Sequence, residues 1–208
     1  LHDRDSYQIR AVGPDGRPGK DVASQGNLTM FLPADSRTSD DRIHGCMTAV
    51  SFDSGRTVLI AQGPQKKLRM FELDGGRVTK FLHQTTLSYE YTSLTTADVR
   101  GQRFLIAWNL DRVDVYGPLN DTTLNVTCTY PQTYSGITVK AVFPFSVGGK
   151  SFLFIHDSAN ECVVRRMYMN GSVDWANPVY RETYDHDYER MFACRVGDLV
   201  FCFGHNED

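Results

Sequence analysis

Histidine, carboxylate and tyrosine side chains occupy corresponding positions ahead of four regularly spaced glycines. Eleven residues before these glycines stand His44, Glu90, Ile137 and His186, and ten residues before them stand Gly45, Tyr91, Thr138 and Asp187. Imidazole and carboxylate groups held together can transfer protons, bind a divalent ion or hydrogen-bond a polar ligand. If the protein is an enzyme, we expect the catalytic residues to be Glu90, Asp187, His186, His44 and Tyr91. Glu90 or Asp187 would move a proton, a histidine would assist, and Tyr91 would stabilise developing charge.

Several common catalytic patterns do not occur in the sequence. It contains no Gly-x-Ser-x-Gly turn, no phosphate-binding glycine loop, no His-Glu-x-x-His and no Cys-x-x-Cys. The string Asp185-His186-Asp187 is by itself typical of a solvated polar loop. We therefore expect neither a metal nor a cofactor. An enzyme on this chain would be an isomerase, cyclase, lyase or hydrolase with one acid and base pocket.

Tyrosines gather in the segments that connect the expected strands. Seven of the ten lie in or beside these connectors, namely Tyr89, Tyr91, Tyr130, Tyr134, Tyr180, Tyr184 and Tyr188. A tyrosine offers a flat apolar face and a hydroxyl, which suits a sugar, an aromatic ligand or a protein epitope. Alternatively, the rings only pack between sheets. The expected ligand-binding residues are Tyr89, Tyr91, Tyr134, Tyr184, Asp187 and Tyr188.

A repeated unit must position these side chains. Two apolar strands flank a glycine turn four times, at residues 49–60, 96–106, 142–154 and 192–201. The glycines Gly55, Gly101, Gly148 and Gly197 stand 46, 47 and 49 residues apart. One small antiparallel sheet cannot bury both its faces until neighbouring copies cover them. The period therefore predicts stacked sheets.

Further strands complete the units. Third strands are expected at 68–73, 112–116 and 163–168, and the turns after the first and third contain Asp-Gly and Asn-Gly, which favour hairpins. Fourth strands are expected at 77–81, 123–127 and 173–175. The last unit has no third strand of its own. The stretch Tyr7–Val12 before Asp15-Gly16 would supply it and close a ring, which removes exposed sheet edges.

On these strands and turns the chain resembles a four-bladed β-propeller, similar in architecture to tachylectin and hemopexin propellers. The Trp-Asp pairs of WD repeats and the hemopexin motif are absent. The resemblance implies an all-β fold of four-stranded antiparallel blades, with the N- and C-termini sharing the closing blade. A single domain would span residues 1–208. Its blades would cover roughly 43–93, 94–139, 140–188, and 189–208 plus 1–42.

Composition limits the partners and suggests a compartment. The 22 basic and 25 acidic residues are mixed along the chain with a net charge of −3, so a nucleic acid partner is not expected. No apolar run approaches the ~20 residues that a membrane-spanning helix needs.

Four glycosylation motifs, at Asn27, Asn120, Asn125 and Asn170, predict a secreted glycoprotein. Five cysteines could form disulfides, with Cys194–Cys202 and Cys128–Cys162 as candidate pairs, or fill apolar space.

These features favour a secreted, lectin-like propeller that binds carbohydrate or another small ligand through a face rich in tyrosine and acid. It would be a monomer or a weak homo-oligomer. The alternatives are the cofactor-independent enzyme and a protein-interaction scaffold without a pocket. Several equivalent pockets between blades would favour the lectin, whereas one central pocket joining the acid and base residues would favour the enzyme.

Overall fold

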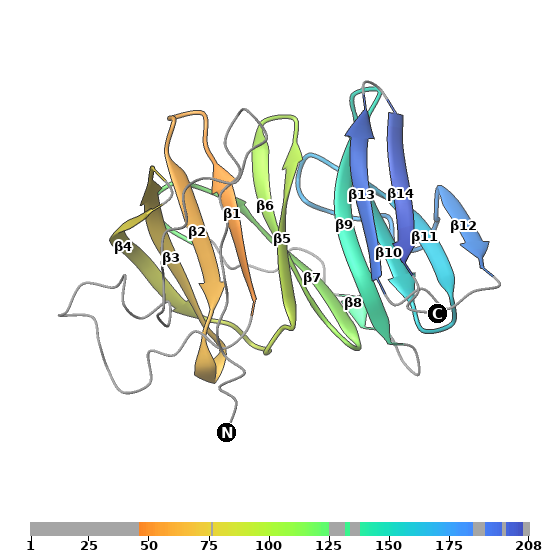
Figure 1. Ribbon diagram of the computed structural model, residues 1–208, viewed down its shortest axis with the longest axis horizontal. Coiled ribbons are helices and arrows are strands. Elements are labelled where there is room, and N and C mark those ends of the chain that lie inside the picture. The colour runs from red at the N-terminus through yellow and green to blue at the C-terminus, as the bar shows by residue number, and fades with distance from the viewer. Residues whose placement is uncertain are drawn as a thin grey trace.

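A computed structural model describes residues 46–75, 77–124, 132–133, 138–184, 190–196 and 199–205. These residues form antiparallel sheets that follow one another along the chain (Figure 1). The predicted closing strand Tyr7–Val12 lies outside the described residues, as does Gly197.

Each of the first three sheets has four strands in sequence order. Sheet 1 contains β1 (Met47–Ser51), β2 (Thr57–Gln62), β3 (Lys67–Asp74) and β4 (Arg77–Thr86), with a short 3-10 turn, η3 (Pro64–Lys66), before β3. Sheet 2 contains β5 (Ser93–Val99), β6 (Gln102–Asn109), β7 (Arg112–Leu119) and β8 (Gln132–Thr133). Sheet 3 contains β9 (Val139–Val147), β10 (Lys150–Asp157), β11 (Glu161–Met167) and β12 (Tyr180–Thr183). The fourth sheet has two strands in the described part, β13 (Arg190–Val196) and β14 (Leu199–His205).

The sheets join through their first strands. Residues of β1 contact β5, those of β5 contact β9, and those of β9 contact β13. We call the interface of sheets 1 and 2 the first seam, and that of sheets 2 and 3 the second seam. Figure 1 shows these sheets side by side. The repeated strand pairs predicted from the glycine spacing are therefore confirmed, and each begins a sheet.

Strand β6 explains why the second strands read as continuous apolar runs. Its side chains alternate between two hydrophobic clusters, because successive residues of a strand point to opposite faces. Leu105 and Ala107 join the cluster at the first seam, and Phe104 and Ile106 join the cluster at the second. All four are fully buried. Neighbouring sheets thus cover both faces of sheet 2, as the repeat predicted.

The turns between first and second strands need glycine in the described sheets. Gly55, Gly101 and Gly149 have φ values of +82°, +84° and +69°, a region that side chains with a Cβ rarely adopt. The turn after β3 differs slightly from its prediction. Because Asp74 pairs with Arg77, Asp74 belongs to the strand and is not a central residue of the turn.

Two fourth strands differ from their predictions. Of the predicted strand 123–127, Thr123 and Leu124 are not in a strand and the other residues lie outside the described part, while β8 lies at 132–133. Of residues 173–175 only Val173 forms a β-bridge, and β12 begins at Tyr180. In both places a polar side chain competes for backbone N–H groups and makes a local turn. Asn120 Oδ1 accepts hydrogen bonds from the N–H of Thr122 and Thr123, and Asp174 Oδ1 accepts one from Asn177.

Among the described residues, no helix has the length and apolar character that a bilayer crossing requires.

Candidate functional site

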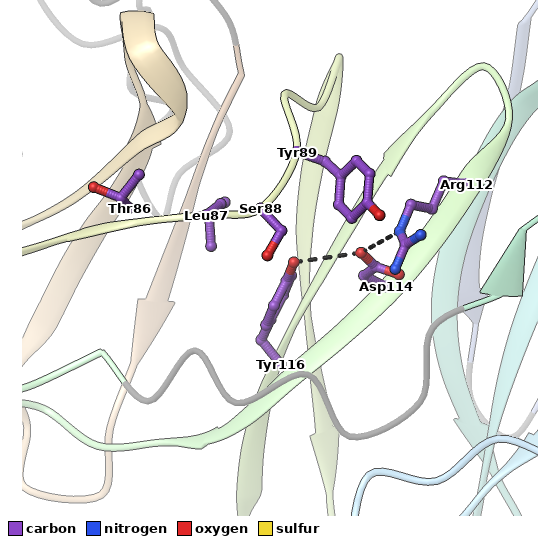
Figure 2. A pocket seen from close by; sticks show the side chains of 7 residues that line it. All are labelled: Thr86, Leu87, Ser88, Tyr89, Arg112, Asp114 and Tyr116. Carbon is purple, nitrogen blue, oxygen red and sulfur yellow. Dashed lines mark hydrogen bonds and ion pairs between the residues drawn. The ribbon is translucent and has the colours of Figure 1, made fainter.

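A small polar cavity opens at the first seam, between the end of β4 and the start of β7 (Figure 2). Its volume is about 160 Å³. We call it the first-seam pocket, and it is lined by Thr86, Leu87, Ser88, Tyr89, Arg112, Asp114 and Tyr116.

Strand β7 supplies one wall of the first-seam pocket. Arg112, Asp114 and Tyr116 alternate along the strand and so share one face. Val113 and Val115 take the other face and lie in the cluster at the second seam. The strand is therefore fixed by apolar packing on one side, while its polar side faces sheet 1.

The connector between β4 and β5 supplies the opposite wall, and a buried glutamine holds it in place. Gln62, at the end of β2, is only 3% exposed. Its Nε2 donates to the carbonyl of Tyr89 at 3.0 Å, and its Oε1 accepts from the N–H of Tyr91 at 2.8 Å. Buried Leu87 also anchors the connector, its N–H donating to the Lys66 carbonyl at 2.9 Å. These contacts fix the backbone that presents Tyr89.

Asp114 is the centre of the hydrogen-bond network. Its Oδ2 accepts from Arg112 Nε at 2.7 Å, from the Tyr116 hydroxyl at 3.3 Å, and from the Tyr91 hydroxyl. Tyr91 and Tyr116 also share a hydrogen bond of 2.6 Å between their hydroxyls. The other oxygen, Asp114 Oδ1, is buried and has no hydrogen-bond partner among the described residues. A buried carboxylate oxygen without a donor is costly, and Asp114 is one of the residues that line the first-seam pocket.

The network perturbs the titration of its members. Burial, followed by the hydrogen bond to Asp114 and then the one to Tyr116, raises the pKa of Tyr91 above its ordinary value of 10.0. Burial acts to lower the pKa of Arg112, but the hydrogen bond and charge of Asp114 outweigh it and raise that pKa. Tyr91 therefore stays protonated at neutral pH, and Arg112 keeps its positive charge beside Asp114.

Arg112 also stacks on the tyrosine that the connector presents. Its guanidinium carbon lies 3.9 Å from the centroid of the Tyr89 ring, within the range of a cation–π interaction. Figure 2 shows Tyr89 and Arg112 side by side above Asp114. Tyr89 is 42% exposed. The site thus combines a cationic donor, a carboxylate acceptor and an accessible aromatic ring.

The structure separates the three consecutive residues that the sequence placed in one site. Tyr89 lines the first-seam pocket. Tyr91 is 5% exposed and does not line the pocket, and its hydroxyl donates a hydrogen bond to Asp114. Glu90 is exposed, and its backbone carbonyl accepts a hydrogen bond from Asn109 Nδ2 at 3.0 Å. The predicted partners of Glu90 and Tyr91, namely His44, His186 and Asp187, lie outside the described residues.

The remaining predicted residues lie elsewhere. Tyr184 follows β12 in sheet 3, its N–H donates to the Asn160 carbonyl, and burial raises the pKa of its hydroxyl to about 12. Tyr134 and Tyr188 lie outside the described residues, as do the sequon residues Asn27 and Asn125. Asn120 and Asn170 are exposed, and their glycosylation remains a prediction.

The cysteines give little support to the candidate disulfides. In the register of β13 and β14, Cys194 pairs with Phe201 and Cys202 with Ala193, so the two cysteines are not opposite each other. Cys162 Sγ lies 3.9 Å from Met191 Sδ, and Cys128 is outside the described residues. Cys46 is a buried thiol, and burial raises its pKa to about 11.

Sequence reasoning missed Gln62, Arg112, Asp114 and Tyr116. A signal for three of them was present, because the run Arg112-Val-Asp-Val-Tyr116 alternates polar and apolar residues with period two. Such a strand presents a polar face, and an acid beside an arginine on that face marks a candidate site. In the part of the chain that the structure describes, no three His, Cys, Asp or Glu side chains lie close enough to hold a metal ion.

No protein-family model matches the sequence, and no curated protein matches it. Solved structures do match the fold. One is BBS1N in complex with ARL6DN soaked with lead, with a TM-score of 0.56, 10% identity, and coverage of 78% of this chain and 51% of that chain. The same complex soaked with mercury matches with a TM-score of 0.50, 13% identity, and coverage of 76% and 47%.

The chain is an all-β β-propeller. Its antiparallel four-stranded sheets and its structural neighbours agree on this fold. At this level of identity the likeness concerns the fold alone. The chain spans about half the length of the solved chains that it matches.

Proposed function

We propose that this propeller is a binding module that recognises a protein partner at the first-seam pocket. The observation that carries the proposal is that Asp114, whose buried Oδ1 has no donor among the described residues, lines a cavity flanked by the exposed Tyr89. A second support is that both solved structures named above are of BBS1N in a complex with another protein, ARL6DN.

The size and charge of the first-seam pocket indicate what it would accept. Its volume of about 160 Å³ is below the roughly 300–1,000 Å³ of pockets for drug-sized ligands. It suits the end of one side chain from a partner that contacts the surface around it. Because Arg112 already neutralises Asp114, a neutral donor such as a hydroxyl or amide fits better than a second cation. Tyr89 would pack its free face against the same partner.

A carbohydrate ligand, bound outside the cell, is the second candidate. It is favoured by the Arg112–Asp114 pair beside a tyrosine ring, because sugar hydroxyls donate and accept hydrogen bonds while the apolar sugar face stacks on a ring. The four sequons support an extracellular location. The sites would not repeat around the propeller, since the connector between sheets 2 and 3 does not carry the same residues.

The enzyme hypothesis depends on residues beyond this pocket. Its centre would need His44, His186 and Asp187 near Glu90, and these side chains would have to lie within about 15 Å of one another to work together. Tyr91 would act only as a hydrogen-bond donor at neutral pH, since its pKa is raised.

The test compares two exposed tyrosines. Tyr89→Ala removes the ring at the first-seam pocket, and Tyr180→Ala removes an equally exposed ring on β12 as the matched control. Each purified protein is immobilised and exposed to a cell extract, with bound proteins identified by mass spectrometry, and in parallel to a glycan array. We expect proteins that the wild type and Tyr180→Ala retain and Tyr89→Ala loses.

A glycan lost in the same pattern would support the second candidate instead. Retention of every protein and glycan by Tyr89→Ala would overturn both. Asp114→Asn serves as a second variant, with folding checked by circular dichroism. We expect it to weaken the same binding about tenfold, the effect of a hydrogen bond to a charged group.

A further inference from the structure

An open groove lies on the other side of the propeller, at the second seam. It is formed where the β5–β6 turn of sheet 2 meets the β9–β10 and β11–β12 turns of sheet 3, and its volume is about 460 Å³. We call it the second-seam groove. Its walls include Arg100, Lys150, Ser151, Arg166, Tyr168 and Met169.

The second-seam groove carries positive charge, and its described lining contains no acid. Arg100, Lys150 and Arg166 line it. Arg100 and Lys150 are exposed. Arg166 is partly buried, its Nε has no hydrogen-bond partner among the described residues, and its guanidinium carbon lies 5.7 Å from the Tyr168 ring centroid. Three cations thus face one open volume.

Charged residues pair across the first seam. Asp53, in the β1–β2 turn, forms an ion pair of 3.1 Å with Arg103, the second residue of β6. At the second seam, the β5–β6 turn consists of Arg100 and Gly101, and the second residue of β10 is Ser151. The turn at the second seam thus carries a cation and no acid, and a serine stands at the position of Arg103.

The pair of opposite residues next to the turn also loses its charges from sheet 2 to sheet 3. Asp98 lies opposite Arg103 in sheet 2 and pairs with it at 2.6 Å, whereas the opposite pair in sheet 3 is Ser146 and Ser151, joined by a hydroxyl hydrogen bond of 3.0 Å. Acids that the first seam supplies from within the chain are therefore missing at the second.

Arg100 also occupies a backbone conformation that does not suit it. Its φ is +54°, where asparagine or glycine is favoured and most other residues are strained. Gly101 follows with φ of +84°, so asparagine would give the favoured Asn-Gly turn. Backbone strain of this kind is typical of functional positions. The arginine therefore holds an unfavourable φ at the edge of the groove, where its Nη1 lies 3.9 Å from Met169 Sδ.

We propose that the second-seam groove binds an acidic peptide segment of a partner protein. Carboxylates of the segment would take the place of the missing acids beside Arg100, Lys150 and Arg166. The exposed Tyr168 and Met169 would contact an apolar side chain of the same segment. This site uses none of the residues of the first-seam pocket, and its test is independent of that pocket.

A peptide fits these observations better than a polyanion or a free phosphate. The cations come from three separate elements along an open groove rather than from one tight loop of backbone N–H groups. The net charge of −3 opposes a long uniform polyanion such as nucleic acid. An apolar rim beside the cations adds contacts that only a ligand with side chains can use.

The test uses a fluorescein-labelled peptide of sequence Glu-Glu-Leu-Glu-Glu-Leu and fluorescence anisotropy with the full chain. The same peptide with Gln in place of every Glu is the ligand control. Lys150→Gln and Arg100→Asn are the test variants, and Lys80→Gln removes one exposed lysine from β4 as the charge-matched control. Inorganic phosphate and a single-stranded oligonucleotide of thymidine serve as competitors.

We expect saturable binding of the Glu peptide that weakens as NaCl is raised. Lys150→Gln should lower the affinity about twofold to fivefold, the range for one exposed ion pair. Arg100→Asn should lower it similarly while leaving the protein folded, because asparagine suits the turn. Lys80→Gln should leave the affinity unchanged.

Three results would overturn the proposal. One is equal binding of the Gln peptide, and another is an equal loss of affinity in Lys80→Gln and Lys150→Gln. The third is displacement of the peptide by phosphate at matched ionic strength or by the oligonucleotide at equal concentration, which would assign the groove to another anion.

Discussion

The two seams join similar sheets by different means. At the first seam, charged residues of sheet 1 and sheet 2 pair across the interface. The pairs are Arg103 with Asp53, and Arg56 with the side chain and carbonyl of Asp121. At the second seam, the β11–β12 turn packs directly on sheet 2. A Cβ on Gly171 would stand 2.5 Å from Cε1 of the fully buried Phe104. Charged side chains thus pair with one another at the first seam, whereas at the second seam Arg100, Lys150 and Arg166 line an open groove.

The apolar packing between sheets therefore does not determine which polar residues a blade carries on its surface. Apolar clusters fill both seams, so either could be stable without ion pairs. The polar residues around these clusters can therefore differ from seam to seam without loss of stacking, and such differences can serve binding.

The largest effect is expected from the close packing of the second seam. Gly171→Ala should lower the free energy of unfolding by about 2–5 kcal/mol, since it combines a positive φ with overlap on a buried ring. Gly101→Ala is the matched control, with φ of +84° against +85° and no atom within 4 Å of the added Cβ. It should cost only about 1–2 kcal/mol. Urea denaturation measures both, and equal losses would mean that Phe104 does not restrict the turn.

A smaller loss is expected inside the first seam. Tyr91→Phe removes one donor to the buried Asp114 and should cost about 1–3 kcal/mol at pH 7. Tyr168→Phe, at an exposed tyrosine of the second seam, should change stability by less than about 0.5 kcal/mol.

The loss in Tyr91→Phe should also depend on pH. The pKa of Tyr91 is raised in the folded protein, so its contribution is fully present below about pH 10, the pKa of an unfolded tyrosine. It diminishes at higher pH, because the unfolded chain then loses the proton that the folded one keeps. The difference between wild type and Tyr91→Phe should therefore shrink above pH 10. Denaturation at pH 8 and pH 10.8 measures it, and a difference that grows with pH would contradict the assignment.

Removing charge at the first seam should cost less again. Arg103→Gln breaks the ion pairs with Asp53 and Asp98 and should lower the free energy of unfolding by about 1 kcal/mol. The loss should shrink in 1 M NaCl, where exposed pairs are screened. If the loss is the same at both salt concentrations, the arginine acts through packing instead.

The smallest effect should have the opposite sign. Arg100→Asn at the second seam relieves an unfavourable φ and should raise the free energy of unfolding by about 0.5 kcal/mol. Lys150→Gln, which changes charge without relieving strain, is the control and should leave stability unchanged. A loss of stability in Arg100→Asn would show that the contact of Arg100 Nη1 with Met169 Sδ, at 3.9 Å, outweighs the relief of the unfavourable φ.

The strands that build the sheets were predictable because their apolar runs and turn glycines recur with the repeat. β1, β2, β5, β6, β9 and β10 all fall where the sequence placed them. The outer strands β8 and β12 were not predictable. The segments after Asn120 and around Asp174 have the composition of strands, but hydrogen bonds from these two side chains to nearby backbone N–H groups turn the chain locally.

The candidate site was predictable only in part. Tyr89 was identified because its connector is rich in tyrosine. Its partners come from β7, whose place beside that connector depends on how sheet 2 stacks against sheet 1. Gln62 looked like an ordinary strand residue, and its role appears only when the chain folds back on it.

The packing of strand β6 determines how the propeller would unfold. Because its alternate side chains belong to the two different clusters, sheet 2 cannot melt without exposing apolar surface on both neighbours. In arrays coupled through nearest neighbours, such an inner unit transmits unfolding in both directions. Sheets 1, 2 and 3 would then be lost in one cooperative transition rather than one after another.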